Sequence, residues 1–457
     1  MTHPLGGELL AYSDLDGTHG AGPARGAALA TLARAARGRV LVAGPHDPGL
    51  IDAIGESIGA NQLTLLVRAR PDAETLAARY PAATVYSGDL FALDATVDGD
   101  IAYDTVVALA GLDRLTGPET DRPEWTEVLD RLTRRLRPDG VLLLGMTNPL
   151  GVHWLTAPPG PPADQDWTED LGGPGFDAIL SALGRPVVRA YGGFPSPVEP
   201  AVLIGSDTPD SGVLQAALRR TSLPPGALAD PGQVAARALR SQAAMPVAAA
   251  WFLVAGAIAD VDLPTSVPDS AGPAGRTLEE SISAAAAKRD LPAVRELVQA
   301  WQQGPAGVPA DQVIVEPSGL TALSAGDEPI EALRRLAAFL TRNGYAHAWP
   351  AEGVTDLTVA LAAMAGIELH PADVPPGEPA QTWHDLVAER DELARLLTET
   401  QAQRAAYQQL ADERAQKLRE TLHLVELLST SGPARMGRAF VGGVRVARRT
   451  ARRFRLR

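Results

Sequence analysis

Short apolar runs recur through the first third of the chain, separated by stretches with helical periodicity. The runs are nearly continuous in Val, Leu and Ala, which is typical of strands buried on both faces of a sheet. They cover residues 40–43, 63–67, 82–86, 104–109 and 141–146. Helices are expected before the first run, over 24–36, and between later runs, after Asp47-Pro48, after Pro71 and over 124–136. This alternation predicts parallel βαβ units in a Rossmann-like, doubly wound α/β sheet.

The rhythm changes after residue 150. Val187 to Tyr191 and Ala201 to Ile204 flank a Gly- and Pro-rich loop and predict a terminal antiparallel hairpin. Residues 211–375 predict a mainly α-helical domain, with amphipathic helices within 277–302, 329–340 and 358–365. The uncharged, alanine-rich stretch 243–259 is marginal in length for a membrane span and is interpreted as a buried strand or helix.

Heptad spacing begins after a Pro-rich linker. One stripe steps by seven through Leu386, Leu393, Thr400 and Tyr407. Leu396 and Leu410 form a second stripe, which polar side chains interrupt at positions 389 and 403. The pattern predicts a C-terminal coiled coil over 382–430, through which copies of the chain would form a homo-oligomer. A single long helix packed on its own protein is the alternative.

Length and charge complete the expected organisation. The 457 residues are too many for one ordinary core. We expect an N-terminal extension (1–23), the α/β domain (24–210), the helical domain (211–375), the coiled coil (382–430) and a basic tail (431–457). The net charge is −14, yet 432–457 holds nine arginines and no acidic residue. An acidic body disfavours nucleic-acid binding, whereas the tail could dock on an anionic membrane or remain solvated.

Other counts exclude several kinds of site. The chain has no cysteine, which excludes disulfides, thiolate metal sites and a cysteine nucleophile. Its eight histidines are scattered, so no metal site is expected. The first seven residues lack the basic and apolar regions of a signal peptide. These features predict a cytoplasmic protein, with peripheral attachment to the inner face of the membrane as a further hypothesis.

Four short motifs follow the predicted strands in order. They are Val42-Ala43-Gly44-Pro45-His46, Leu65-Leu66-Val67-Arg68, Ser87-Gly88-Asp89-Leu90 and Tyr103 to Ala108, with a Pro-Asp-Gly turn at 138–140 before the fifth strand. Together they resemble class I S-adenosylmethionine-dependent methyltransferases. The resemblance covers about 30–210 and implies S-adenosyl-L-methionine as cofactor. It implies cofactor-binding positions at Gly44, His46, Arg68, Asp89, Leu90 and Ala108.

Two of these positions depart from the family pattern. His46 stands where the family has a second glycine, and Arg68 replaces the acid that accepts the ribose hydroxyls. An arginine cannot accept a hydrogen bond. Asp89 matches the aspartate that accepts from the adenine amino group, although a loop residue or a helix cap is the other interpretation.

A later stretch narrows the resemblance. Residues 148–154 read Asn-Pro-Leu-Gly-Val-His-Trp, and 194–200 carry three prolines. Both resemble a methyltransferase subgroup linked to cell-surface glycans, which implies a glycan or glycolipid acceptor. Asn148 and His153 would then face the acceptor as catalytic residues, with His153 as general base. A loop histidine without chemistry is the alternative.

Two functions therefore stay open. The first is methyl transfer to an oxygen or nitrogen of a small-molecule or glycan acceptor. The second is a non-catalytic methyltransferase-fold scaffold, which the changes at His46 and Arg68 favour. A third pattern, Asp14-Leu15-Asp16-Gly17-Thr18, resembles a phosphatase motif, but no lysine precedes Lys288 to offset phosphate charge. We interpret it as an Asp-Gly turn.

Overall fold

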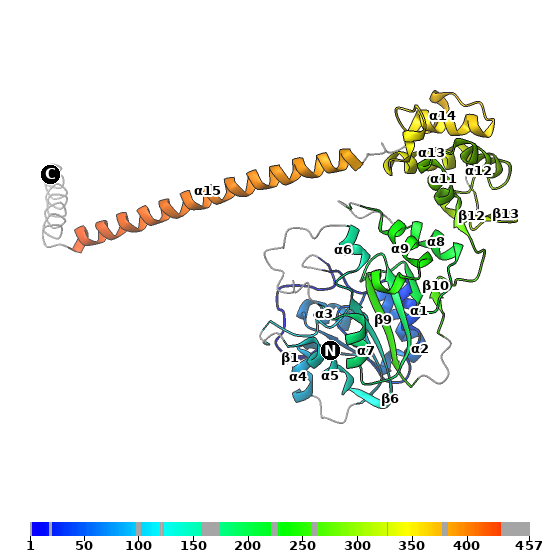
Figure 1. The fold of residues 1–457 in the computed structure, drawn as a ribbon. Coiled ribbons are helices and arrows are strands. Elements are labelled where there is room, and N and C mark those ends of the chain that lie inside the picture. The colour runs from blue at the N-terminus through cyan, green and yellow to red at the C-terminus, as the bar shows by residue number, and fades with distance from the viewer. Residues whose placement is uncertain are drawn as a thin grey trace, which may run out of the picture. The chain divides into compact units, whose positions relative to one another are not determined.

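The chain divides into two units, Met1–Trp383 and His384–Arg457. In this computed structural model, the described residues are 2–17, 21–96, 102–118, 120, 123–156, 173–220, 227, 229–257, 263–326, 328–376 and 383–430. The first unit contains a sheet domain (2–267) and a helical domain (276–374), and the second contains one long helix (Figure 1).

A ten-stranded mixed sheet forms the sheet domain. In chain order the strands are β1 Thr2–Gly6, β2 Val40–Ala43, β3 Leu63–Val67, β4 Thr84–Gly88, β5 Tyr103–Ala108, β6 Leu136–Thr147, β7 Val187–Phe194, β8 Val202–Gly205, β9 Ala250–Gly256 and β10 Ser266–Val267. Their spatial order is β1-β4-β3-β2-β5-β6-β9-β7-β8-β10. Pairing is parallel from β1 to β6 and antiparallel from β6 to β10.

The five strands at the centre carry the expected Rossmann-like order. From β2 the chain proceeds through β3 and β4 on one side, and through β5 and β6 on the other. The order therefore reverses between β2 and β5, and the crevice at such a switch point is where open α/β sheets bind ligands. The mixed α/β class and the doubly wound centre agree with the sequence prediction.

Helices cover both faces of this sheet (Figure 1). They are α1 Ala27–Ala33, α2 Pro48–Ile58, α3 Arg70–Arg79, α4 Leu90–Thr96, α5 Trp125–Thr133, α6 Val152–Thr156, α7 Phe176–Ala182, α8 Gly212–Arg219, α9 Pro231–Arg240 and α10 Ala244–Val247, with the short turn η1 Ala60–Gln62. Alternate residues of β2 enter different cores. Val40 belongs to the same core cluster as Leu29 of α1, whereas Leu41 belongs to the cluster that contains Leu129 of α5. The continuous apolar run is explained by this two-sided burial.

Three strands of this sheet, β1, β9 and β10, lie outside the expected domain limits. Strand β10 falls within 211–375 and pairs with β8. Strand β9 falls within 211–375, yet it lies between β6 and β7, with Val141 paired to Gly256. All its residues are buried, and a short apolar run of this kind does not distinguish a strand from a helix. Strand β1 belongs to the expected extension 1–23 and pairs with β4 through its backbone. Strands β7 and β8 form the antiparallel hairpin that the sequence predicts.

The helical domain has its own core around the fully buried Trp301. It contains α11 Leu278–Ala287, α12 Leu291–Gln303, α13 Pro329–Arg342 and α14 Val354–Ala365, the turns η2 Ala310–Gln312, η3 Tyr345–Ala348 and η4 Pro371–Asp373, and a small sheet of β11 Arg276–Thr277, β12 Val313–Glu316 and β13 Gly319–Ala322. Arg219 of α8 forms a buried ion pair with Glu279 of α11. Burial raises the pKa of Glu279 to about 7, although the guanidinium opposes that shift.

Helix α15 has 48 residues, Trp383–Thr430, and all of them from His384 onward belong to the second unit. It coincides with the predicted segment 382–430, while the coiled coil itself stays a prediction. The basic tail 431–457 lies outside the described residues. Among the helices that the structure describes, none is both long and apolar enough to cross a membrane.

Candidate cofactor edge

The predicted cofactor positions gather at one edge of the sheet. Strands β2, β3, β4 and β5 are parallel, so their carboxyl ends meet there. Gly44 follows β2, Arg68 follows β3, Asp89 and Leu90 follow β4, and Ala108 ends β5. The sequence therefore located the edge, and the contacts of each residue decide what it can bind.

His46 joins the two strands at the switch point. Its imidazole is fully buried, and Nδ1 lies 3.0 Å from the Gly44 carbonyl oxygen. Its Nε2 accepts a hydrogen bond of 3.1 Å from the Leu109 backbone N–H, directly after β5. Because an amide N–H only donates, Nε2 must be the unprotonated nitrogen, and Nδ1 carries the proton. The ring thus occupies the crevice between β2 and β5.

Burial also fixes the charge of this ring. It lowers the pKa of His46 to about 4, and the hydrogen bond to Gly44 only partly opposes the shift. The imidazole is therefore neutral at pH 7. A neutral ring that uses both nitrogens within the protein has no donor or acceptor left for a ligand.

The space beside Gly44 is also filled. Gly44 has φ of 92°, a conformation that glycine adopts without strain. A Cβ at this position would lie 3.4 Å from Leu115 Cδ2 and 3.8 Å from Ala110 Cβ. In the family, a glycine here leaves space for the methionine part of the cofactor. In this chain, side chains of the protein itself border that space.

Arg68 is held by a residue from the N-terminal segment. Its Nε and Nη2 each donate to the Asp14 carboxylate at 2.8 Å. Both side chains are largely buried, with 17% and 10% exposed. Such a two-point pair is among the stronger side-chain contacts in proteins. The phosphatase-like motif around Asp14 therefore has a structural role here.

Asp14 belongs to an N-terminal segment, residues 7–17 and 21–25, that makes further contacts with this edge. We call this segment the N-terminal strap. The strap hydrogen-bonds β3 through Leu9, whose N–H donates 3.0 Å to the Arg68 carbonyl. It bonds the turn after β2 through Ala24, whose N–H donates 3.0 Å to Pro45. The strap thus crosses the carboxyl ends of β3 and β2.

Three further groups fasten the strap. Asp72 of α3 accepts from Ser13 Oγ at 2.5 Å and from the Asp14 N–H at 2.8 Å, while burial raises the pKa of its carboxyl group. Arg114 Nη1 donates 2.6 Å to the Ala21 carbonyl. Gly117 lies so close that a Cβ there would be 1.9 Å from the Gly7 oxygen. The strap is therefore packed on the edge.

Both carboxylate oxygens of Asp89 accept hydrogen bonds within the protein. One carboxylate oxygen accepts from the Phe91 N–H at 2.7 Å, and the other accepts from the Gly117 N–H at 2.7 Å and Thr120 Oγ1 at 2.5 Å. The side chain is only 3% exposed. These contacts match the second sequence interpretation, a residue that organises its own loop. Leu90 and Ala108 are buried core residues.

These contacts do not fit S-adenosylmethionine in the described conformation. The positions that the family resemblance assigns to adenine, ribose and methionine are occupied by the partners of Asp89, by the pair at Arg68 and by the His46 ring, respectively. Among the described residues, no group of three or more His, Asp or Glu could hold a metal ion.

The two predicted catalytic residues lie beyond β6. Asn148 is 2% exposed and its Nδ2 donates to the carbonyls of Pro246 and Ala248 at 2.9 and 2.8 Å. Its Oδ1 accepts from the Leu150 N–H at 2.9 Å, so the amide ties the loop after β6 to the segment before β9. Both polar atoms of this buried side chain are therefore already hydrogen-bonded within the protein.

His153 lies on α6 against Trp154, with ring centroids 5.0 Å apart. Within the part of the chain that the structure describes, neither of its buried ring nitrogens has a hydrogen-bond partner. Burial lowers its pKa to about 4, which makes it a weak base at pH 7. Its role as general base stays a prediction.

Sequence reasoning missed the groups that occupy the edge. Asp14, Leu115 and Gly117 come from segments without strand or helix patterning. Only Arg68 could have indicated such a contact from the sequence, because a cation at the end of a buried strand requires an acidic partner.

No protein-family model matches the chain, and no curated protein matches it. Solved structures share the fold class at low similarity. One is the complex of the Haloferax volcanii Trm112 methyltransferase activator with a putative methyltransferase, 15% identical over 50% of this chain and 89% of that chain, with a TM-score of 0.31. Another is a putative sarcosine dimethylglycine methyltransferase from Galdieria sulphuraria, 14% identical over 50% and 81%, with a TM-score of 0.27. A DUF574 family protein from Streptomyces avermitilis is 14% identical over 50% and 79%, with a TM-score of 0.28. Scores of this size do not identify an activity, so the site is judged on its own contacts.

Proposed function

We propose that the sheet domain is a non-catalytic scaffold with a methyltransferase-like fold. One observation carries the proposal, namely that the His46 ring bridges Gly44 and Leu109 across the switch point. A ligand in this crevice would have to break both hydrogen bonds and displace the ring. Residues that already satisfy one another stabilise the empty fold, which is what a scaffold requires.

The estimated free energy of breaking these contacts favours a scaffold over an enzyme whose cofactor site opens easily. Each net hydrogen bond contributes about 1 kcal/mol, and bonds to charged groups contribute about 1.5–3 kcal/mol. Opening the edge at His46 and Arg68 together would cost roughly 4 kcal/mol or more on this scale. An opening cost of about 4 kcal/mol would weaken the apparent affinity for a cofactor on the order of 1,000-fold.

The other parts of the chain give the scaffold its proposed role. Helix α15 would assemble copies of the chain, and the arginines of 432–457 would dock them on an anionic membrane surface from the cytoplasmic side. Each basic residue near such a surface contributes about 1 kcal/mol. We expect the full chain to sediment with vesicles that contain anionic lipid, and a chain ending at residue 431 to stay in solution. Equal sedimentation of both chains would contradict docking through the tail.

Methyl transfer from S-adenosylmethionine is the second candidate, with an oxygen or nitrogen of a glycan or glycolipid as acceptor. The specific observation in its favour is the Gly88-Asp89 pair at the end of β4, in a sheet with the strand order that the resemblance implies. In this case the N-terminal strap would have to leave the edge before the cofactor binds.

Calorimetry separates the two candidates. The full chain is titrated with S-adenosylmethionine and S-adenosylhomocysteine, beside an Asp14→Ala variant that loosens the strap and an Asp89→Ala control. The scaffold proposal predicts no binding heat at millimolar ligand in any of the three. Micromolar binding by the full chain or by Asp14→Ala, with loss in Asp89→Ala, would contradict it and support a cofactor site under the strap.

A further inference from the structure

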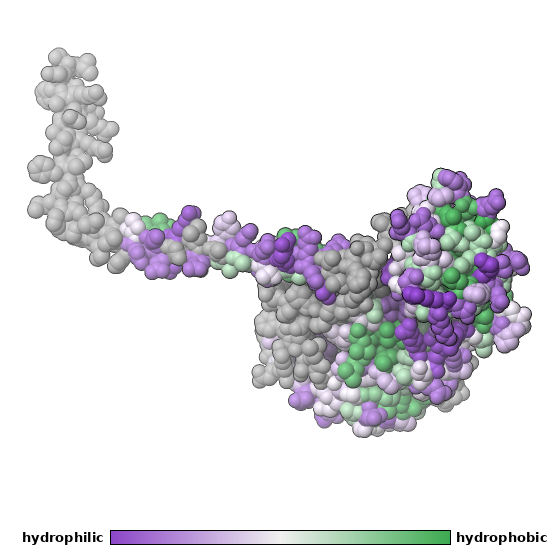
Figure 2. Space-filling view, turned by 45° about the horizontal axis from the view of Figure 1, so that its top comes forward, coloured by the Kyte–Doolittle hydropathy of each residue, from purple (hydrophilic) through white to green (hydrophobic). Residues whose placement is uncertain are grey.

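Helix α15 exposes apolar side chains at heptad spacing. Leu393 and Leu396 are 59% and 45% exposed, and Tyr407 is 72% exposed. Figure 2 shows a mostly hydrophilic helix with hydrophobic residues at intervals along it. A lone helix in water gains little from such residues, because helices in proteins are stabilised mainly by packing an apolar face.

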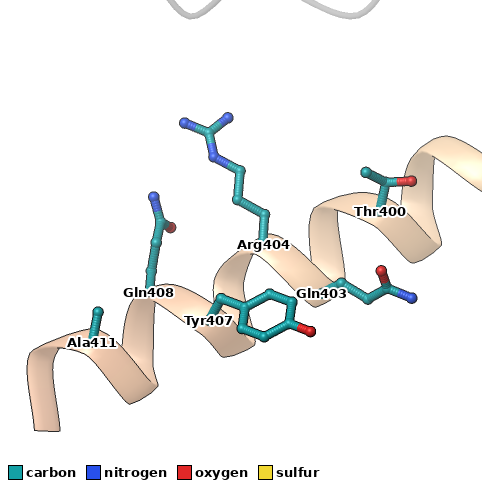
Figure 3. A pocket seen from close by; sticks show the side chains of 6 residues that line it. All are labelled: Thr400, Gln403, Arg404, Tyr407, Gln408 and Ala411. Atoms are coloured by element: carbon teal, nitrogen blue, oxygen red, sulfur yellow. The ribbon is translucent and has the colours of Figure 1, made fainter. Parts of the chain in front are cut away.

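The positions of these residues define a seam. Leu393, Thr400 and Tyr407 occupy the first heptad position (a), and Leu396 and Gln403 the fourth (d). Figure 3 shows Gln403 and Tyr407 projecting from a different side of the helix than Arg404 and Gln408. Beyond Tyr407 the apolar spacing changes to Ala411, Ala415, Leu418 and Leu422, a shift that locally unwinds a coiled coil without ending the seam.

Charges beside the seam distinguish the possible orientations. Before the shift, position g carries Glu392 and Glu399, and position e carries Arg390, Leu397 and Arg404. In a parallel, in-register pair, g of one helix faces e of the next heptad on its partner, so Glu399 faces the second copy's residue 404, an arginine. In an antiparallel pair, g faces g and e faces e, which places like charges together.

We propose that α15 is one strand of a parallel, in-register, two-stranded coiled coil, and that its occupant is a second copy of this chain. Leu396 at d is the residue type that favours two strands. Thr400 and Gln403 form a polar layer, and a polar layer fixes register at some cost in stability. A partner of another sequence would need a matching polar layer and the complementary charge pattern, whereas a second copy supplies both. The inference does not rest on whether the sheet domain binds a cofactor.

Light scattering of the full chain tests the association. We expect twice 47.8 kDa, and a single 47.8 kDa species for the Leu393→Asp, Leu396→Asp double variant. Thr398 is exposed at an outward heptad position, so Thr398→Asp is the matched control and should keep the doubled mass. A wild-type monomer at about 100 μM protein would overturn the proposal, because mass action favours association at high protomer concentration. A double variant that keeps the doubled mass would also overturn it, because the contact would then lie elsewhere.

Single cysteines test the orientation, since the chain has none of its own. In the parallel register, Leu396→Cys places two sulfurs at the same seam position, and mild oxidation should link the two copies. Thr398→Cys should link much more slowly. In an antiparallel pair centred on the middle of the helix, residue 396 faces residue 417, and Leu418 is the seam residue next to it. A disulfide that forms preferentially between Leu396→Cys and Leu418→Cys chains would therefore overturn the parallel arrangement. Both readouts are independent of cofactor titration, so failure here is distinguishable from failure of the scaffold proposal.

Discussion

Asp14 and Arg68 form a two-point ion pair, although 54 residues separate them in the chain. Arg68 stands at the strand end where the family resemblance implies a ribose-binding acid, and Asp14 comes from the N-terminal strap that crosses this edge. The family pattern assigns this position to a ligand, whereas here it is occupied by an ion pair within the protein. It also keeps a partly buried guanidinium compensated, which its low exposure requires.

A double-mutant cycle measures this pair. With Asp14→Asn and Arg68→Gln, we expect a coupling free energy of about 1–3 kcal/mol in urea unfolding, because both charges are largely buried. Arg70 and Glu74 provide the matched control, with 59% and 60% of their side chains exposed. Their coupling should be about 0.5 kcal/mol or less. Equal coupling in the two cycles would mean that the strap does not hold Arg68.

Gly117→Ala should lift the N-terminal strap. A Cβ at this position would lie 1.9 Å from the Gly7 carbonyl oxygen, which is backbone and cannot rotate away. We expect the Leu9 amide, which donates to Arg68, to exchange with solvent at least about tenfold faster, corresponding to about 1.4 kcal/mol of lost protection. Gly55→Ala is the control, since nothing lies within 4 Å of its Cβ. Unchanged Leu9 exchange in Gly117→Ala would show that this contact does not fasten the strap.

Asn148→Ala should behave as a structural substitution. Its side chain makes three hydrogen bonds to the backbone of the loop after β6 and the segment before β9. Removing it leaves these buried groups without partners, which should lower the free energy of unfolding by about 2–4 kcal/mol in chemical denaturation. A decrease in the free energy of unfolding of less than about 0.5 kcal/mol would contradict a structural role and would again favour a role of Asn148 in acceptor binding.

Stability should fall in mild acid because of His46. The folded pKa is about 4 and the ordinary value is 6.5, so the unfolded chain binds more protons between these pH values. Stability is therefore fully present above about pH 6.5 and is lost as the pH falls toward 4, by on the order of 3 kcal/mol from this group. His153 acts in the same direction, with a folded pKa of about 4.

Subtraction isolates the contribution of His46. Urea unfolding of the wild type and of His46→Gln is compared from pH 4.5 to 7.5. The difference between the two should shrink as the pH falls, because glutamine does not titrate. His347→Gln, at a 3-10 turn of the helical domain, serves as control. A difference that stays constant across the range would contradict a buried neutral His46.

The strand pattern was readable from the sequence because both faces of β2, β3 and β5 are buried, which leaves continuous apolar runs. Strand β9 was not, since its uncharged run is as compatible with a helix as with a strand. Strand β1 has no apolar run and is fixed by backbone pairing with β4. The predicted limits 24–210 therefore left β1, β9 and β10 out of the sheet domain, although most of the helices and strands were predicted.

The sequence predicted which residues lie at the candidate edge, but it did not predict the side chains and backbone groups that contact them. Parallel strands bring Gly44, Arg68 and Asp89 together whatever their side chains do. The partners that satisfy them come from 14, 109 and 117, and no local pattern reports such distant contacts. His46 shows the limit clearly, because its sequence position suggested a ligand contact and its two hydrogen bonds close the crevice.

Nitrogen NMR of the histidine side chains tests the central claim most directly. In a sample labelled only at histidine, assigned with His46→Gln, the account predicts a neutral His46 with the proton on Nδ1 from pH 5.5 to 8. It further predicts that millimolar S-adenosylmethionine leaves both nitrogen shifts unchanged, because the ring holds Gly44 and Leu109. A tautomer with the proton on Nε2, or a saturable shift of this ring with added S-adenosylmethionine, would contradict a crevice closed by the protein itself.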